Sequence, residues 1–206
     1  MRKSQFTGSA WGLFGWQVLL TISVLLFVIP IVFVFPLYVK WLYEHLEIDG
    51  KQLEFDYDGP WWGLLGWSLF AFITFGIGSF YATKRIIQFM IKHAKIKGES
   101  TDGSEFAGSA WYIFLFWILW GLCGYAFFIP LAFLFPYMSK YMVTNTKYSG
   151  RVLKFTSEDI WWGAYGWFML AVLTFGFGAF YAQKRMIQWI VNHTNFEKVN
   201  ERIYEL

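Results

Sequence analysis

The sequence predicts an all-α integral membrane protein in which four transmembrane helices form two tandem two-helix repeats related by pseudo-twofold symmetry. Three observations support this fold class. Hydrophobic residues make up 57% of the chain and charged residues only 15%, whereas a soluble domain carries about 25% charged residues. Four long stretches contain no formal charge, and the second half of the chain aligns with the first without gaps at a shift of one hundred residues.

The internal repeat runs from Phe6 to Lys95 and again from Phe106 to Asn195, with roughly 35 of 90 aligned positions identical. Gly8-Ser9-Ala10-Trp11, Pro30, Pro36 and Trp61-Trp62-Gly63 all recur one hundred residues later. We therefore divide the chain into a first two-helix membrane repeat over residues 1–100, a second over residues 101–196 and a short cytoplasmic tail over residues 197–206.

The uncharged stretches are long enough for membrane helices. They lie between Lys3 and Lys40, Asp58 and Lys84, Glu105 and Lys140, and Asp159 and Lys184. Each exceeds the roughly 20 apolar residues that cross the hydrocarbon core of a bilayer. Helices are expected because lipid offers backbone groups no partner and because barrel strands would alternate apolar and polar residues, which these stretches do not.

Two prolines interrupt the first of these stretches. A straight helix from Trp11 to Val39 would measure about 44 Å, against about 30 Å of hydrocarbon. Pro30 and Pro36 can each kink a helix, because proline lacks the backbone N–H and clashes with the preceding turn. The sequence predicts a crossing helix from Trp11 to Ile29, then a kinked segment along the outer surface, and the same arrangement from Trp111 onward.

The loops indicate an orientation. Lys and Arg are more numerous at the two ends and in the middle loop than in the loops after the first and third stretches. Basic residues favour the cytoplasmic side of a membrane, so both termini are predicted to be cytoplasmic.

The two outer loops predict small β-hairpins. Ile48-Asp49-Gly50-Lys51 and Tyr148-Ser149-Gly150-Arg151 each place a glycine turn beside an alternating apolar pattern. Charges reverse between the repeats at two positions, which suggests that the loops attract one another and form a cap outside the membrane. The expected pairs are Glu47 with Lys147 and Glu54 with Lys154.

A duplicated polar signature follows the second and fourth stretches. It consists of Lys84, Arg85, Gln88 and His93 in the first repeat and Lys184, Arg185, Gln188 and His193 in the second. Apolar residues between them describe an amphipathic helix at the membrane interface. Such a helix either binds anionic lipid headgroups or a partner protein, or acts as a plain basic anchor.

The glycines before this signature have two interpretations. Thr74, Gly76 and Gly78, and equally Thr174, Gly176 and Gly178, stand near the cytoplasmic end of a predicted crossing. They either pack closely against the other repeat or unwind to line a pore or substrate path. Packing is the interpretation that we favour.

Neither a catalytic site nor a metal or cofactor site is predicted. His45, His93 and His193 are far apart in the sequence and lack metal-ligand spacing. No charged residue falls inside a predicted span, and the single cysteine, Cys123, is expected to pack. The chain is expected to be no enzyme and to bind no nucleic acid.

Several of these motifs resemble the YjgN-like family of bacterial inner-membrane proteins, which are described only as domains of unknown function. The resemblance lies in Phe6-Thr7-Gly8-Ser9, Ile73-Thr74-Phe75-Gly76-Ile77-Gly78, the following Lys84-Arg85, and Ile48-Asp49-Gly50-Lys51 with Leu53 and Phe55. It implies a multi-pass protein of the bacterial inner (cytoplasmic) membrane and implies no activity.

Two functions are consistent with the sequence. The favoured one is a non-enzymatic scaffold or accessory subunit that binds membrane lipids and can bind another membrane protein or a second copy of itself. The alternative is a small channel or transporter whose path runs between the repeats.

Overall fold

The computed structural model describes residues 4–26, 29–157 and 160–197, and within them the chain forms helical hairpins and two antiparallel sheets. The first half contains β1 (Gln5–Phe6), α1 (Ala10–Leu25), α2 (Ile31–Glu44), β2 (Leu46–Ile48), β3 (Lys51–Phe55), α3 (Trp62–Ile73), α4 (Ser79–Lys92) and β4 (Ala94–Ile96). The second half contains β5 (Glu105–Phe106), α5 (Ala110–Cys123), the 3-10 turn η1 (Gly124–Ala126), α6 (Leu131–Thr144), β6 (Thr146–Tyr148), β7 (Arg151–Phe155), α7 (Trp162–Leu173), α8 (Ala179–Asn192) and β8 (Thr194–Phe196). Equivalent elements of the two halves thus lie one hundred residues apart.

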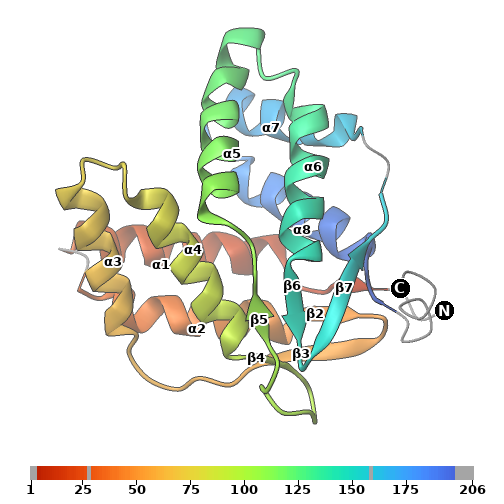
Figure 1. Ribbon diagram of the computed structural model, residues 1–206. Coiled ribbons are helices and arrows are strands. Elements are labelled where there is room, and N and C mark those ends of the chain that lie inside the picture. The colour runs from red at the N-terminus through yellow and green to blue at the C-terminus, as the bar shows by residue number, and fades with distance from the viewer. Residues whose placement is uncertain (1–3, 27–28, 158–159, 198–206) are drawn as a thin grey trace.

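The predicted all-α, four-span fold is wrong. Each uncharged stretch extends over parts of two short helices between which the chain reverses direction, and Figure 1 shows this most clearly for α5 and α6. In the part of the chain that the structure describes, no helix combines the length and the apolarity needed to cross a membrane. The helices have 12 to 16 residues, so the longest measures about 24 Å.

The sheets give a second reason for this correction. Each has the strand order of the sequence, β1-β2-β3-β4 and β5-β6-β7-β8. In the first, Leu53 of β3 lies opposite Ile96 of β4, and Phe6 of β1 lies opposite Leu46 of β2. These strands were predicted to lie on opposite sides of a membrane. Their pairing overturns the multi-pass topology and, with it, the predicted inner-membrane localisation.

The backbone takes a left-handed conformation at the turns of the α3–α4, α5–α6 and α7–α8 hairpins. Phe75 and Gly76 have φ angles of 49° and 84°, and Phe175 and Gly176 have 51° and 90°. Phe127, just after η1, has a φ of 50°. Helical residues have φ near −63°, so these residues reverse the chain within a few positions. The uncharged sequence continues through each turn, which is why one membrane crossing was predicted in each stretch.

The prolines connect neighbouring hairpins. Pro36 and Pro136 lie inside α2 and α6, where each lacks the N–H that would bond to the carbonyl four residues earlier. Those carbonyls, of Val32 and Ala132, instead accept the backbone N–H of Trp61 at 3.0 Å and of Trp161 at 2.8 Å. The proline therefore fixes the start of the next hairpin.

Another duplicated motif begins the first hairpin of each half. Ser9 is the N-cap of α1, and its hydroxyl accepts the N–H of Gly12 at 2.8 Å. Ser109 caps α5, with its hydroxyl accepting the N–H of Trp111 at 3.3 Å. A side chain at Gly8 would overlap the ring of Phe6, which is buried in β1. The pattern Phe-x-Gly-Ser thus joins a strand to a capped helix.

The predicted glycine turns are present, between β2 and β3 and between β6 and β7. The predicted pair of Glu47 with Lys147 is wrong. Glu47 accepts a hydrogen bond from Gln5 at 2.6 Å, and Lys147 pairs with Glu105 at 2.6 Å. Glu54 lies opposite Lys95 in the first sheet. Each of these contacts lies within one half, because a neighbouring strand is closer than the other half.

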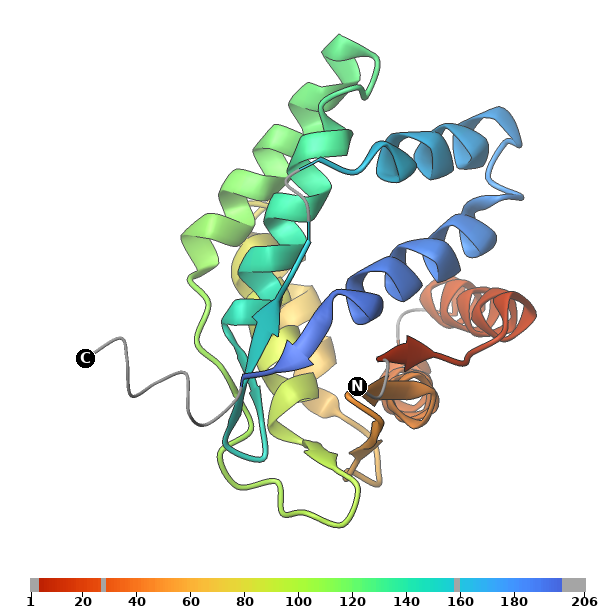
Figure 2. The ribbon, with the colours of Figure 1, turned by 90° about the vertical axis from the view of Figure 1, so that its right-hand side faces the viewer.

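The two halves share one core. Its buried members include Phe55 and Leu53 from the first half and Leu153 and Phe155 from the second. The hairpins diverge from this core, and α8 packs beside α1 while α4 packs beside α5. Figure 2 shows the α5–α6 and α7–α8 hairpins pointing away from the sheets in different directions.

Candidate functional site

The free ends of the four hairpins expose large apolar side chains. The exposed fractions are 75% for Leu25, 96% for Phe75, 88% for Tyr125 and 94% for Phe175. Folded monomers rarely expose large contiguous apolar patches unless these contact another molecule. Phe75 and Phe175 also have positive φ angles, a conformation that costs a non-glycine residue about 1–3 kcal/mol. The hairpin ends are therefore a candidate contact surface.

Two predicted pore or packing triads, Thr74, Gly76 and Gly78 with Thr174, Gly176 and Gly178, build two of these ends. The Thr74 hydroxyl donates to the Phe70 carbonyl at 2.8 Å and accepts the Gly78 N–H at 2.9 Å. A side chain at Gly78 would overlap Phe70 and Thr74 of the same hairpin. Thr174 accepts the Gly178 N–H at 2.7 Å. The triads hold their own turns in place.

Arg85 and Arg185 lie on the helices that leave these ends. The Arg85 guanidinium stands 5.8 Å from the centre of the Trp67 ring and 5.1 Å from that of Tyr81. It donates to the Tyr81 hydroxyl at 2.6 Å and to the Gln88 side-chain oxygen at 3.2 Å. These cation–π and hydrogen-bond contacts hold the guanidinium at one place on the surface. The charge of Arg85 is not neutralised by them.

Arg185 repeats this geometry in the second half. Its guanidinium lies 5.7 Å from the centre of the Trp167 ring and 5.2 Å from that of Tyr181, and it donates to the Tyr181 hydroxyl at 2.8 Å. Two copies of one positively charged, aromatic-lined site therefore stand on α4 and α8. The sequence signature identified the arginines, while Trp67, Trp167 and the two tyrosines of the site were missed.

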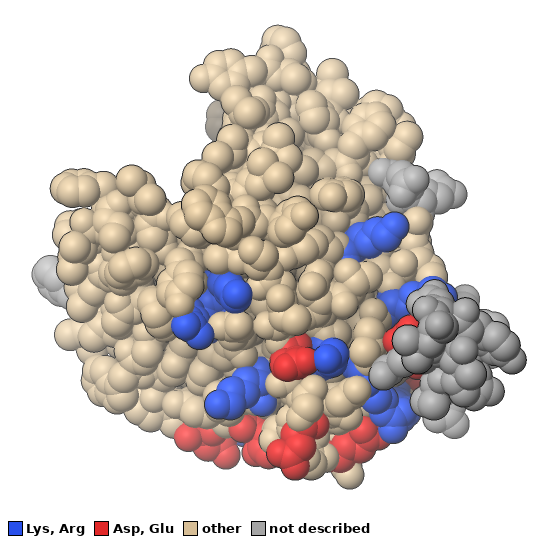
Figure 3. Space-filling view, viewed as in Figure 1, with Lys and Arg blue, Asp and Glu red and all other residues tan. Residues whose placement is uncertain are grey.

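The cations of the sheets differ from those of the helices. Lys95 pairs with Asp56 at 2.7 Å and Lys147 with Glu105 at 2.6 Å. Lys84, Arg85 and Lys92 of α4, like Lys184 and Arg185 of α8, make no ion pair with a described residue. Figure 3 shows charge of both signs gathered over the lower part of the molecule, while its upper part is uncharged on this face.

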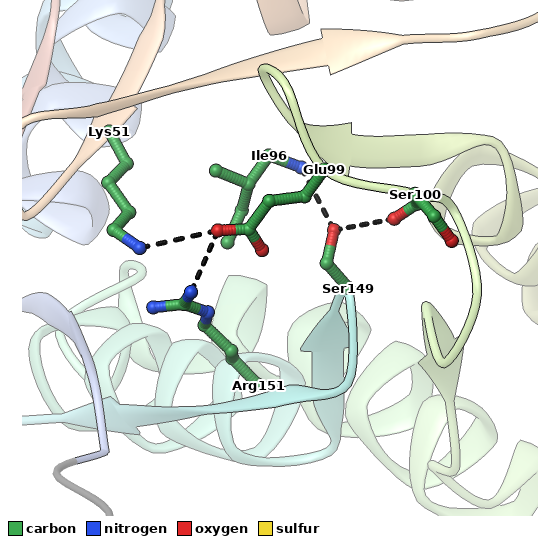
Figure 4. Close-up of polar contacts among 6 residues, drawn as sticks. All are labelled: Lys51, Ile96, Glu99, Ser100, Ser149 and Arg151. Atoms are coloured by element: carbon green, nitrogen blue, oxygen red, sulfur yellow. Dashed lines mark hydrogen bonds and ion pairs between the residues drawn. The ribbon is translucent and has the colours of Figure 1, made fainter.

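A second polar cluster lies where the linker between the halves crosses both sheets (Figure 4). Glu99 accepts from Lys51 of the first half at 3.4 Å and from Arg151 of the second half at 2.7 Å. Ser149 accepts the Ile96 N–H at 3.2 Å and donates to the Ser100 carbonyl at 2.8 Å. Charges and donors are satisfied within this cluster, so it joins the halves and leaves little capacity for a ligand.

Of the four predicted site residues on and beside α4, three line a cavity and one does not. Arg85, Gln88 and His93 line one cavity of about 580 Å³ on α4, together with Lys92, while Lys84 is not among its lining residues. Glu105 also lines the cavity, but its carboxylate is held by Lys147.

The histidines have a structural position. His93 and His193 follow the last residues of α4 and α8 as their C-caps. The Nδ1 atom lies within hydrogen-bond distance of the carbonyl oxygen four residues earlier, at 2.9 Å for His93 and 2.7 Å for His193. His45 makes the same contact with Trp41 at 2.7 Å. The His93 ring packs on Phe89. Among the described residues no group of His, Cys, Asp and Glu side chains is placed to hold a metal ion.

Comparison with known proteins gives one match. No curated protein and no solved structure matches the chain. Residues 40–203 match the model of a family described as bacterial protein of unknown function, DUF898. This match covers most of the chain: it begins inside α2 and includes both arginine sites and the whole of the second sheet. DUF898 is the YjgN-like family that the sequence motifs resemble. The chain therefore belongs to the DUF898 family of bacterial proteins of unknown function.

Proposed function

We propose that this chain is a non-enzymatic lipid-binding protein that inserts the free ends of its helical hairpins into one face of a bilayer and holds anionic headgroups with the cations of α4 and α8. One observation carries the proposal. Bulky apolar side chains are almost fully exposed at the hairpin ends, away from the sheets where charges are paired. Hydrocarbon is the surrounding in which such ends would be stable.

The dimensions of the hairpins support insertion into a single leaflet. Helix α3 has 12 residues and so measures about 18 Å, while one leaflet contributes about 15 Å of hydrocarbon. Moving the side chain of Phe75 or Phe175 from water into hydrocarbon contributes about 2 kcal/mol each.

The cations suit the headgroup region. A basic residue close to an anionic membrane surface contributes about 1 kcal/mol, and the five side chains on α4 and α8 make no ion pair with a described residue. Tyrosine and tryptophan rings prefer the same interface, and Tyr81 and Trp67 surround Arg85. Aromatic rings and cation would therefore reach the same depth.

Flotation with lipid vesicles tests the proposal. Vesicles of phosphatidylcholine, alone or mixed with phosphatidylglycerol, should carry the wild-type chain, with tighter binding to the mixture. Phe75→Ser combined with Phe175→Ser should weaken binding to both by about 1,000-fold, since about 4 kcal/mol is removed. Arg85→Gln combined with Arg185→Gln should weaken binding to the anionic mixture by about 30-fold.

A matched control uses cations that already have partners. Lys95→Gln combined with Lys147→Gln removes the same net charge from the paired residues of the sheets. It should lower binding to the anionic vesicles by less than about threefold, because long-range charge is screened beyond about 10 Å. Equal losses of binding in the control and in the arginine variant would contradict a headgroup role. Flotation of the double phenylalanine variant equal to that of the wild type would contradict insertion.

The two further roles expected from the sequence stay predictions. A scaffold role would require a partner protein or a second copy that binds beside the lipid surface. A channel or transporter would require ion or solute flux through vesicles that contain the chain. The glycines expected along such a path form the two hairpin turns, so we do not build on this alternative.

A further inference from the structure

The α5–α6 hairpin contains an elongated apolar cleft that the proposed bilayer contact does not require. Its volume is about 630 Å³, within the range of about 300–1,000 Å³ that is usual for small-molecule sites. The walls are apolar side chains of both helices. They include Leu119 and Leu122 of α5 and Phe133, Leu134 and Tyr137 of α6.

The cleft is apolar at one end and positively charged at the other. Pro130 lines it at the free end of the hairpin, and Lys140 lines it at the end nearer the sheets. Lys140 follows Pro130 by ten positions along α6, which corresponds to about 15 Å along the helix axis. Among its described lining residues, Lys140 alone carries a charge. A ligand that matches this cleft has a single apolar chain and an anionic group at one end.

The first half offers an equivalent hairpin for comparison. Its lysine, Lys40, is 3.0 Å from the Asp58 carboxylate and so is already neutralised. Lys140 is exposed and makes no ion pair with a described residue, while the counterpart of Asp58, Glu158, lies outside the described residues. The two lysines therefore form a natural pair for comparison.

We propose that the α5–α6 cleft binds one medium-chain fatty acid, with its carboxylate on the Lys140 ammonium group and its chain along Leu119, Leu122 and Phe133 toward Pro130. A charge-assisted hydrogen bond fixes the carboxylate end, and burial of the chain against the apolar walls supplies most of the affinity. One cation at one end of a single cleft selects an amphiphile that has one chain and one anionic group.

The single cysteine of the sequence provides the readout. Cys123 lies in the wall of the cleft, and a bound chain would shield its thiol. Burial raises the pKa of the Cys123 thiol, so its modification by an uncharged maleimide is followed above neutral pH. The full chain is kept in digitonin, which has no acyl chain, and dodecanoate is added below its micellar concentration.

Dodecanoate should slow the modification of Cys123 at least tenfold in the wild type and in the Lys40→Gln control. The Lys140→Gln variant should need at least tenfold more dodecanoate for the same protection. Dodecanol, which has the chain without the charge, should also need at least tenfold more. Equal protection in the two lysine variants, equal protection by dodecanol, or no protection of the wild type would overturn the assignment.

A second variant tests the position of the chain without relying on the thiol. Leu122 is 53% exposed, so Leu122→Trp can fill the cleft without disturbing the core. Equilibrium dialysis should show that labelled dodecanoate binds this variant at least tenfold more weakly than it binds the wild type. Unchanged binding would place the ligand elsewhere and overturn the proposal. No bilayer is present in either assay, so this inference and the proposed bilayer function can fail separately.

Discussion

The halves meet at two joints, α1 against α8 and α4 against α5, which share an aromatic clamp and differ beside it. In the first joint the ring centre of Phe180 lies 5.8 Å from that of Trp11 and 5.1 Å from that of Phe14. In the second, Phe80 lies 5.9 Å from Trp111 and 4.9 Å from Phe114. These contacts repeat almost unchanged.

The residues beside this clamp differ completely between the two joints. In the α1–α8 joint the Gln17 amide donates to Gln183, which also hydrogen-bonds Tyr38. Burial raises the pKa of Tyr38, and the bond from Gln183 partly offsets that rise. In the α4–α5 joint the equivalent residues are Trp117, Thr83 and Met138, and they line an apolar cavity of about 510 Å³.

Chain connectivity explains why one joint is polar. The α4–α5 joint is tethered by the linker that Glu99 fastens to both sheets, so its helices are held at a high effective concentration. The α1–α8 joint has no such tether along the chain. Its half-buried amide pair would be left unsatisfied in any other register, and an amide that loses its partner away from water is costly. The polar joint therefore fixes the register in which α1 packs against α8.

The largest expected effect concerns the shared core, where the halves also differ. Tyr43 and Tyr148 are buried with their hydroxyls 3.1 Å apart, and their counterparts Val143 and Ile48 are apolar. Tyr43→Ala should lower the free energy of unfolding by about 4 kcal/mol, as for other buried aromatic residues. Val143→Ala should lower it by about 2 kcal/mol. Urea titration followed by circular dichroism measures both, and equal losses would remove this difference between the halves.

The tyrosine pair also predicts loss of stability at alkaline pH. Burial raises the pKa of Tyr148 to about 12 and that of Tyr43 well above its ordinary value. Because the folded-state pKa is raised, the stability is complete below pH 10 and is lost as the pH rises to about 12. The loss should be about 3 kcal/mol. Tyr43→Phe combined with Tyr148→Phe should remove most of this pH dependence; an unchanged alkaline profile would contradict the assignment.

The polar joint can be converted into the apolar one. Gln183→Thr leaves the Gln17 amide without its partner and should lower the free energy of unfolding by about 2 kcal/mol. Adding Gln17→Trp reproduces two of the three residues of the other joint, with Tyr38 unchanged, and should restore more than half of that loss. Thr83→Ala in the apolar joint is the control and should cost less than about 1 kcal/mol. A double variant no more stable than Gln183→Thr would show that the joints are not interchangeable.

The smallest expected effect on stability concerns a difference between the two sheets. Lys95 pairs with Asp56 in the first half, whereas the counterparts in the second half, Asn195 and Thr156, carry no charge. The hydrogen bond from Lys95 lowers the pKa of Asp56 below its ordinary value of 3.8. Its contribution is therefore present above pH 3.8 and is lost as the pH falls below that value. The Tm of wild type should exceed that of Asp56→Asn slightly at neutral pH and match it in acid, while Thr156→Asn should show no such trend.

Sequence alone located the turns of the sheets but not those of the helices. Asp49-Gly50 and Ser149-Gly150 carry turn chemistry, and β2–β3 and β6–β7 turn there. The hairpin ends carry no charge, and Phe75 is a residue that rarely takes a positive φ. An uncharged run of that length fits one crossing helix as well as two short ones. Pairing of β3 with β4 decides between them, and that contact is long-range.

The candidate site was predictable only in part, because some of its contacts also depend on a chain reversal. Arg85, Gln88 and their counterparts stand in a repeated signature on amphipathic helices, so the sequence pointed to them. Trp67 and Tyr81 belong to the site only because the α3–α4 turn brings α3 back beside α4. The exposure of Phe75 likewise depends on a chain reversal that composition does not reveal.

The depth of the hairpin ends in a bilayer is the most direct test of the proposed function. With Cys123 replaced by serine, a nitroxide placed at position 75 or 175 should relax with oxygen and be protected from a water-soluble nickel chelate once vesicles are added. A nitroxide at Gln52, in the first sheet, should respond to the chelate before and after. Nitroxides at 75 and 175 that remain fully accessible to the chelate in the presence of vesicles would contradict insertion.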